Sequence, residues 1–299
     1  MRRRTGGGRD GKEDEKGGDG DGDTRQASYR TRTNSFKATS LLLFQLAFVP
    51  LVVFLFLEAN IKVVLFGKLR LYNTVDFCVL TFFYSHVLES LLSMVFDRAD
   101  RESTSFLSPY RAASTLVLVF QMGRILHCSA DAIHSYATEI KDYSKDMPRD
   151  VLDLIHFLDE DMGHWILFAS YFSLLSLLTA YYPTGHHSKE RAPSPLLPLV
   201  SGLVMGATHA VAVIESSHWW FGVVGCFTML AGCLLTSFSC RNPFLLFSSS
   251  ASLSLLVCLI LYKIAVGSFQ EPSALGGVLH VAKKILTCAA GTWSLTLHC

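Results

Sequence analysis

Seven long apolar runs are the feature of this sequence that most constrains its fold. Each run is close to the roughly 20 residues that a helix needs to cross a bilayer. Half of the 299 residues are hydrophobic and only 17% are charged, which is too apolar for an ordinary soluble domain. The pattern predicts an all-α, polytopic membrane helical bundle with about seven transmembrane helices. The predicted spans are 41–57, 76–96, 112–136, 151–182, 196–215, 219–238 and 244–261.

The sequence divides into three segments around these spans. Residues 1–37 are rich in Arg, Gly, Asp and Glu, and such a polar tail buries too little apolar surface to offset its ordering entropy, so we predict that it is disordered. Its length before the first apolar run is also unlike a signal peptide. Residues 38–265 form the predicted seven-helix transmembrane domain. Residues 266–299 form a predicted C-terminal surface helix or tail, because Lys283 and Lys284 interrupt its apolar pattern.

Charge gives limited information about location and partners. The net charge is +1, and basic residues in the loops are nearly balanced between the two sides. Arg30, Arg32 and Lys37 directly precede the first span and favour a cytoplasmic N-terminus. We therefore expect an integral, multi-pass protein of an internal membrane such as the endoplasmic reticulum or Golgi. Membrane lipids are the expected partners, nucleic acid is not expected to bind, and the sequence does not identify protein partners.

The end of the third span carries a polar helix face. His127, Asp131 and His134 are spaced by four and three residues, so an α-helix would place them on one face. Arg124, one turn earlier, could pair with Asp131 in a purely structural role. The same face could instead contribute imidazole and carboxylate groups to a functional site.

The start of the fourth span carries a second polar face. His156, Glu160 and His164 are spaced by four residues each and share one α-helical face. Asp159 and Asp161 fall on other faces, so we expect them to be solvated or to cap the helix. A short connection joins this segment to the third span, which predicts that the two polar faces converge at one site. A solvent-exposed ion pair is the structural alternative.

Helix direction predicts further members of this site. Successive spans run in opposite directions, so the end of an odd-numbered span and the start of an even-numbered one lie on the same membrane face. His209 and Glu215, in the fifth span, belong to that side, whereas His86 and Glu89 lie deeper in the second span. Ionisable groups within a membrane usually face the bundle interior and serve a function. The pattern therefore indicates a polar cavity open to one face.

Imidazole and carboxylate groups are typical ligands of zinc. With His127-x-x-x-Asp131 and Glu160-x-x-x-His164 in a seven-span chain, the sequence resembles the membrane hydrolases that include the alkaline ceramidases and the progestin/adipoQ receptors. The resemblance covers residues 41–262. It implies a histidine-bound zinc ion that activates water for hydrolysis of a lipid amide.

One departure from that family changes the expected ligand set. The family carries a histidine pair in its last span, and here the span 244–261 has no histidine. The leading hypothesis is a zinc-dependent intramembrane hydrolase of a lipid amide or ester, in which zinc lowers the pKa of bound water to about 7. The expected metal ligands are His127, His164 and His209; the expected catalytic groups are Asp131 and Glu160; the expected second shell or ion path comprises His86, Glu89, His134, His156 and Glu215.

Two alternatives follow from the same residues. The order of the histidine and acid motifs, 127–131 and then 156–164, is also similar to ZIP-type metal permeases, although the Asn, Gly and Pro residues of the permease motifs are absent. That resemblance implies a transporter of divalent cations or protons. The third interpretation is a structural or accessory multi-pass protein whose polar residues stabilise helix packing.

Overall fold

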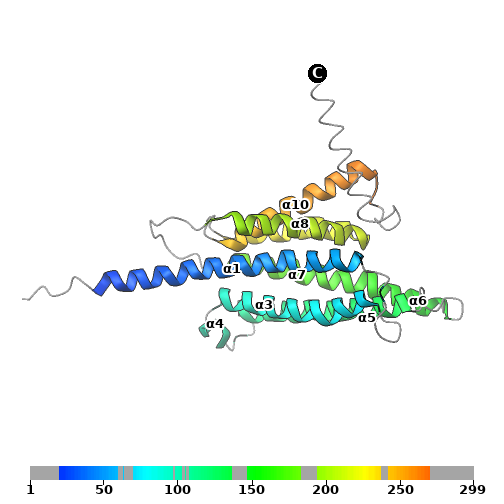
Figure 1. Cartoon of the computed structure of the whole chain (residues 1–299), viewed down its shortest axis with the longest axis horizontal. Helices are drawn as coiled ribbons and strands as arrows, with labels where there is room; N and C mark the ends of the chain where they lie inside the picture. Colours follow the sequence, from blue (N-terminus) through cyan, green and yellow to red (C-terminus); the bar gives the residue numbers. More distant parts are fainter. Residues whose placement is uncertain are drawn as a thin grey trace, which may run out of the picture.

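The computed structural model describes residues 20–59, 63, 70–96, 98–102, 105, 108–136, 147–182, 194–236 and 242–269. The chain forms a helical bundle in which α8 and α10 lie on one side, α1 and α7 in the middle and α3 and α5 on the opposite side (Figure 1). The elements are α1 (Gly20–Ala59), α2 (Leu71–Val75), η1 (Asp76–Leu80), α3 (Thr81–Val95), α4 (Arg98–Glu102), α5 (Pro109–Ser135), α6 (Arg149–His156), η4 (Phe157–Gly163), α7 (His164–Tyr181), α8 (Leu196–Glu215), α9 (Trp219–Leu234) and α10 (Pro243–Val266).

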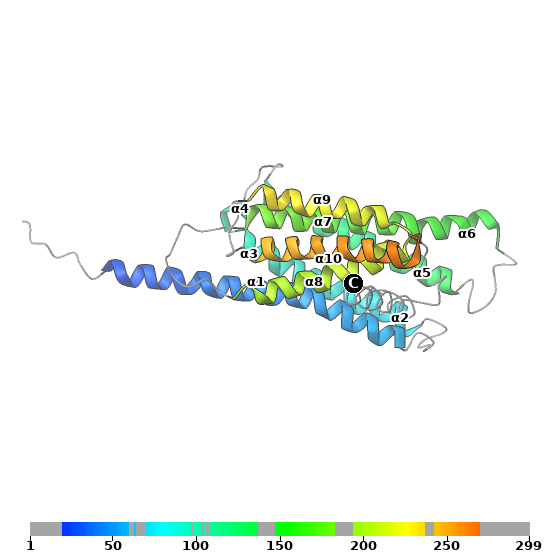
Figure 2. The same ribbon diagram turned by 90° about the horizontal axis from the view of Figure 1, so that it is seen from above.

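The chain is a multi-pass helical membrane protein. Six helical segments within the described residues are long and apolar enough to cross a bilayer. The predicted span 219–238 corresponds to α9, whose 16 residues are fewer than the roughly 20 of a full span. Figure 2 shows α9 running alongside α7, against which it packs. The six spanning segments are Ser35–Leu57, Leu71–Val95, Pro109–His134, Arg149–Tyr181, Leu196–Glu215 and Pro243–Val266.

The two ends of the transmembrane domain differ from their predicted boundaries. α1 begins at Gly20, so residues 20–37 of the segment that was predicted to be a disordered tail belong to this helix. They contain no proline and continue an established span. At the other end, α10 stops at Gly267, whose φ of 83° is the left-handed conformation of a glycine C-cap. Residues 1–19 and 270–299 lie outside the described residues.

In the part of the chain that the structure describes, the π-helical segments η1 and η4 lie within membrane-spanning segments. η1 joins α2 to α3, and η4 joins α6 to α7. A π-helix hydrogen-bonds from residue i to residue i+5, which widens the turn and often marks a functional site. Both segments pack against α5. Side chains in these two segments therefore point in other directions than a regular α-helix would give them.

The remaining helices are held together by close packing. α8 packs along α10, where glycines allow the two backbones to approach: a Cβ atom at Gly206 would lie 2.8 Å from the Cβ of Ser254. Ser254 Oγ also donates a hydrogen bond of 2.7 Å to the carbonyl of Leu203. On the other side of α10, the hydroxyl groups of Thr179 and Ser248 lie 2.9 Å apart. These contacts form a fixed frame beside the polar region around α5.

Candidate functional site: an imidazole pair beside buried carboxylates

The first polar cluster lies between η1 and α5. Arg124, which is only 8% exposed, donates hydrogen bonds from Nη2 to Oδ1 and to the carbonyl oxygen of Asp76, at 2.5 and 3.1 Å. Cys128 Sγ donates to Oδ2 of the same carboxylate at 3.1 Å. The expected pairing of Arg124 with Asp131 is therefore corrected, because Asp131 instead accepts a hydrogen bond of 2.6 Å from Asn73 Nδ2. The Arg124–Asp76 ion pair thus lies within the bundle, and in the described part of the chain the buried Nε of Arg124 has no hydrogen-bond partner.

The second polar cluster lies between α5 and η4. Nδ1 of His127 is 2.8 Å from Oδ1 of Asp159 and 3.4 Å from the carbonyl oxygen of the same residue. Nδ1 of His134 lies 3.9 Å from Oδ2 of Asp159. Asp159 is 2% exposed, so the expectation that it is solvated or caps the helix is wrong. Asp159, rather than Glu160, is the carboxylate that faces α5.

The π-helical segment explains this exchange of carboxylates. Because η4 turns more slowly per residue than an α-helix, it shifts the angular positions of the acids at its centre. Nδ1 of His164 lies 2.8 Å from the backbone carbonyl oxygen of Glu160, to which it donates a hydrogen bond. The carboxylate oxygen Oε2 of Glu160 is farther from the same nitrogen, at 3.6 Å. Gly163 lets the segment approach α5, since a Cβ there would lie 2.9 Å from the Cβ of His127.

The two segments bring the rings of His127 and His164 together. Their centroids are 4.4 Å apart, with an angle of 48° between the ring planes. Carbonyl and carboxylate oxygens only accept hydrogen bonds, so Nδ1 of each neutral ring carries the proton and Nε2 carries the lone pair. Within the described part of the chain, Nε2 of neither ring has a hydrogen-bond partner. The site therefore holds two imidazole lone pairs close together, on side chains that are 20% and 14% exposed.

A third histidine extends the cluster toward α9. His218 lies just before α9, after a turn in which Ser217 has a φ of 57°. Its Nε2 is 3.0 Å from Oδ1 of Asp161, and its ring centroid is 6.4 Å from that of His164. Asp161 was expected to be solvated; its side chain is 37% exposed, and it also contacts the buried ring of His218. Glu215, at the C-terminal end of α8, precedes this turn.

Several expected site residues lie elsewhere. His209 stacks on Tyr171, with centroids 4.8 Å apart, and its Nδ1 bonds the carbonyl of Met205 at 3.0 Å. His156 is exposed, with its ring 6.1 Å from that of His134. His86 is exposed on α3, and Glu89 lines a separate cavity beside the same helix.

The sequence contained a signal for the residues that were missed. Asp159 and Asp161 flank Glu160 in a run of three acids at the start of an apolar span, and Gly163 follows directly. A glycine within a helical pattern indicates an irregular turn or a close approach of another backbone. Together these features are compatible with a π-helical turn, although the α-helical period alone selects Glu160.

The donor types fit zinc better than their arrangement does. His127 and His164 offer two imidazole nitrogens, and a carboxylate orients one of the rings, as in many zinc sites. A catalytic zinc site requires three protein ligands. In the segments that the structure describes, no group of three or more His, Cys, Asp or Glu side chains is arranged to hold a metal ion. The expected third ligand, His209, packs against Tyr171 and Phe172 instead.

Comparisons of the chain with protein-family models, with curated proteins and with solved structures find no match.

Proposed function

We propose that this protein is an intramembrane hydrolase of a lipid amide or ester, and that His127 and His164 form its reactive centre. One observation carries the proposal: two neighbouring imidazole rings each have an acceptor beside Nδ1, and among the described residues neither Nε2 lone pair has a partner. Each of these Nε2 atoms can accept a hydrogen bond or bind an electron-pair acceptor. Water can donate such a hydrogen bond, and its activation is the first requirement of hydrolysis.

The chemistry assigns different tasks to His127 and Asp159. Nε2 of His127 accepts a proton from water as the water oxygen forms a bond to the lipid carbonyl carbon. Asp159 stabilises the resulting imidazolium at Nδ1 and keeps the ring in the required tautomer. The tetrahedral intermediate then collapses, the C–N or C–O bond breaks, and the proton passes from His127 to the leaving nitrogen or oxygen. His164 provides a second acceptor that orients the attacking water.

The surroundings of the site suit a lipid substrate. Ile133, Phe157 and Trp165 are exposed apolar side chains beside the polar cluster, and in a membrane protein such residues face lipid. An acyl chain could lie along these residues while its carbonyl group reaches the imidazole pair. The partial exposure of both rings is consistent with entry from the side.

Zinc remains part of this proposal as an ion that the same two nitrogens would bind. His127 and His164 would hold it through Nε2, and a bound zinc ion would supply an activated water. Since the described residues do not provide a third ligand in position, the steps above depend only on the protein side chains. Elemental analysis of purified protein with and without chelator distinguishes a metal-dependent reaction from one that uses the histidines alone.

The proposal predicts hydrolysis by the purified, full-length protein reconstituted in vesicles. With a panel of lipid amides and esters, we expect fatty acid release from at least one class, reduced by about 10²-fold or more in His127→Gln, which lacks the base. Asp153→Asn, an exposed acid on α6, is the control and should retain activity. Release that persists unchanged in His127→Gln, or no release from any member of the panel, would contradict the proposal.

The grouping of carboxylates within the membrane helices favours a permease as the second candidate. Among the described residues, the polar clusters contain five carboxylates and one guanidinium, and ionisable groups in membrane spans often mark an ion or proton path. The groups are Asp76, Asp131, Asp159, Glu160, Asp161 and Arg124. Proton or zinc flux into the same vesicles that is lost in Asp159→Asn, without lipid hydrolysis, would favour transport. Loss of thermal stability with neither activity would favour a structural role.

A further inference from the structure

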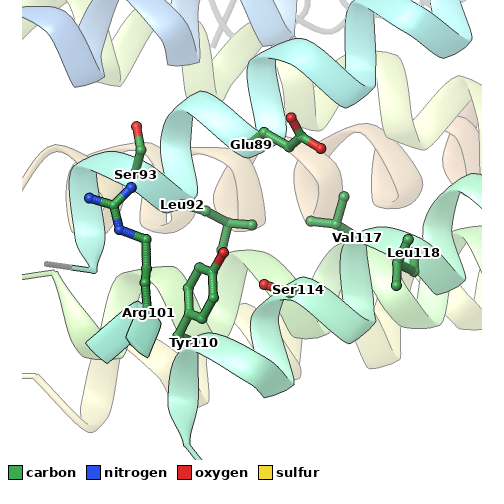
Figure 3. Close-up of a pocket in the computed structure, with 8 residues that line it drawn as sticks. All are labelled: Glu89, Leu92, Ser93, Arg101, Tyr110, Ser114, Val117 and Leu118. Carbon is green, nitrogen blue, oxygen red and sulfur yellow. The ribbon is translucent and has the colours of Figure 1, made fainter. Parts of the chain in front are cut away.

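A separate cavity of about 450 Å³ lies between α3, α4 and α5. Figure 3 shows its lining side chains, with Leu92 between Arg101 and Glu89 and the ring of Tyr110 below them in this view. A volume of this size is typical of small-molecule sites. The lining residues are Glu89, Leu92, Ser93, Arg101, Tyr110, Ser114, Val117 and Leu118.

This cavity is distant from the imidazole pair. Ser114 and His127 are 13 residues apart on α5, which corresponds to about 20 Å along the helix axis. The cavity lies toward the end of the bundle at which α4 is found, whereas α6 marks the other end (Figure 1). The two sites therefore face opposite halves of the membrane, and a ligand of one does not reach the other.

The charged groups of the cavity lie at different depths. Arg101 belongs to α4, in the connection outside the membrane helices. Glu89 lies on α3, which ends at Val95. The six residues between them place Glu89 about 9 Å deeper in the membrane than the end of this helix. The apolar side chains of Leu92, Val117 and Leu118 line the same cavity. From the membrane surface inward, the cavity thus presents a cation, then the apolar side chain of Leu92, and then an acid with Val117 and Leu118 beyond it.

We propose that this cavity binds a single-chain anionic lipid whose phosphate is outermost and carries a hydroxyl or ammonium group directly below it. A guanidinium group binds phosphate through two parallel hydrogen bonds, which suits Arg101. The carboxylate of Glu89 accepts from the hydroxyl or ammonium group, and the chain lies against the apolar side chains of the cavity. A zwitterionic choline lipid has the reverse order, since its cationic group is outermost and would meet Arg101. This inference does not depend on the proposed hydrolysis.

Lysophosphatidic acid and lysophosphatidylcholine with the same acyl chain provide a matched pair of probes. Binding to the full-length protein in nanodiscs is expected for lysophosphatidic acid and at least tenfold weaker for the choline lipid. Arg101→Gln and Glu89→Leu should each weaken lysophosphatidic acid binding by about tenfold, the effect of losing a hydrogen bond to a charged group. Arg111→Gln and Glu102→Gln, exposed residues outside the lining, are the controls for general surface charge.

Thermal melting of each variant in detergent separates binding from folding. Variants that melt like the wild type but lose binding support the site. Equal affinity for the two lipids would overturn the inference, as would Arg101→Gln and Arg111→Gln weakening lysophosphatidic acid binding to the same extent. A Glu89→Leu variant that binds like the wild type would also overturn it, because the acid is then not a ligand contact.

Discussion

Replacing Asp159 with asparagine is expected to reduce lipid hydrolysis by about 10²- to 10⁴-fold, the effect of removing a carboxylate that orients a catalytic histidine. Asp159 is buried and lies 2.8 Å from Nδ1 of His127. An asparagine amide that donates toward Nδ1 would favour the opposite tautomer and place the proton on Nε2. His127 could then no longer accept a proton from water.

The control for this substitution is Asp153→Asn on the same helical segment. Asp153 is exposed, so its replacement should leave activity within about twofold, as is usual for surface substitutions. Rates are measured in vesicles, and folding is checked by thermal melting of both variants. If Asp159→Asn hydrolyses lipid as fast as Asp153→Asn, the buried carboxylate has no role in the reaction.

Replacing Asp76 with alanine is expected to lower the free energy of unfolding by about 3–5 kcal/mol, the effect of removing one partner from a buried ion pair. Arg124 is 8% exposed and bonds both the carboxylate and the carbonyl oxygen of Asp76. Without the carboxylate, a buried guanidinium and the Cys128 thiol lose an acceptor. The measurement is unfolding by denaturant in detergent micelles, with Asp153→Ala as the exposed control.

A double substitution separates this charge effect from a loss of packing. Arg124→Met with Asp76→Ala removes both charges, so we expect it to recover much of the stability lost by Asp76→Ala alone. A double variant that is as unstable as the sum of its two single variants would show that the two side chains act independently.

The overall architecture follows from apolar patterning, because crossing a bilayer imposes a length and a composition that the sequence displays directly. The helical class and six of the spans agree with the structure. The predicted span 219–238 agrees less well with the structure, because α9 ends at Leu234. The residues that follow Leu234 do not mark this end in the sequence. α1 also extends beyond its apolar run to Gly20, through a polar segment whose composition does not predict a helix.

The candidate site was predictable only in part. The proximity of His127 and His164 follows from the short connection between their spans, and the structure brings the rings to 4.4 Å. A regular helical period favoured Glu160, whereas the carboxylate that lies against His127 is Asp159, because this segment is π-helical. Asp131 was one possible partner of Arg124 in the sequence, and the observed partner is Asp76 of η1, a segment that only tertiary packing places against α5.

The two π-helical segments act on α5 in the same way. Each provides a carboxylate to an α5 side chain, Asp76 to Arg124 and Asp159 to His127. A backbone carbonyl in each segment also accepts a hydrogen bond from a side chain. Arg124 donates to the carbonyl of Asp76, and His164 donates to that of Glu160. At the first segment the carboxylate is held in an ion pair with Arg124, whereas at the second the Nε2 atoms of His127 and His164 have no hydrogen-bond partner among the described residues. This difference is why we place the reaction at His127 and His164.

Hydrolysis in ¹⁸O-labelled water tests the central claim most directly, because every hydrolysed lipid acquires the label whatever its headgroup. Reconstituted protein is incubated with a mixed membrane lipid extract, and released fatty acids are analysed by mass spectrometry. We predict fatty acids that carry one ¹⁸O atom in the wild type, and a loss of that signal in His127→Gln and His164→Gln. No labelled fatty acid from the wild type, or equal label from the variants, would contradict a hydrolytic role for the imidazole pair.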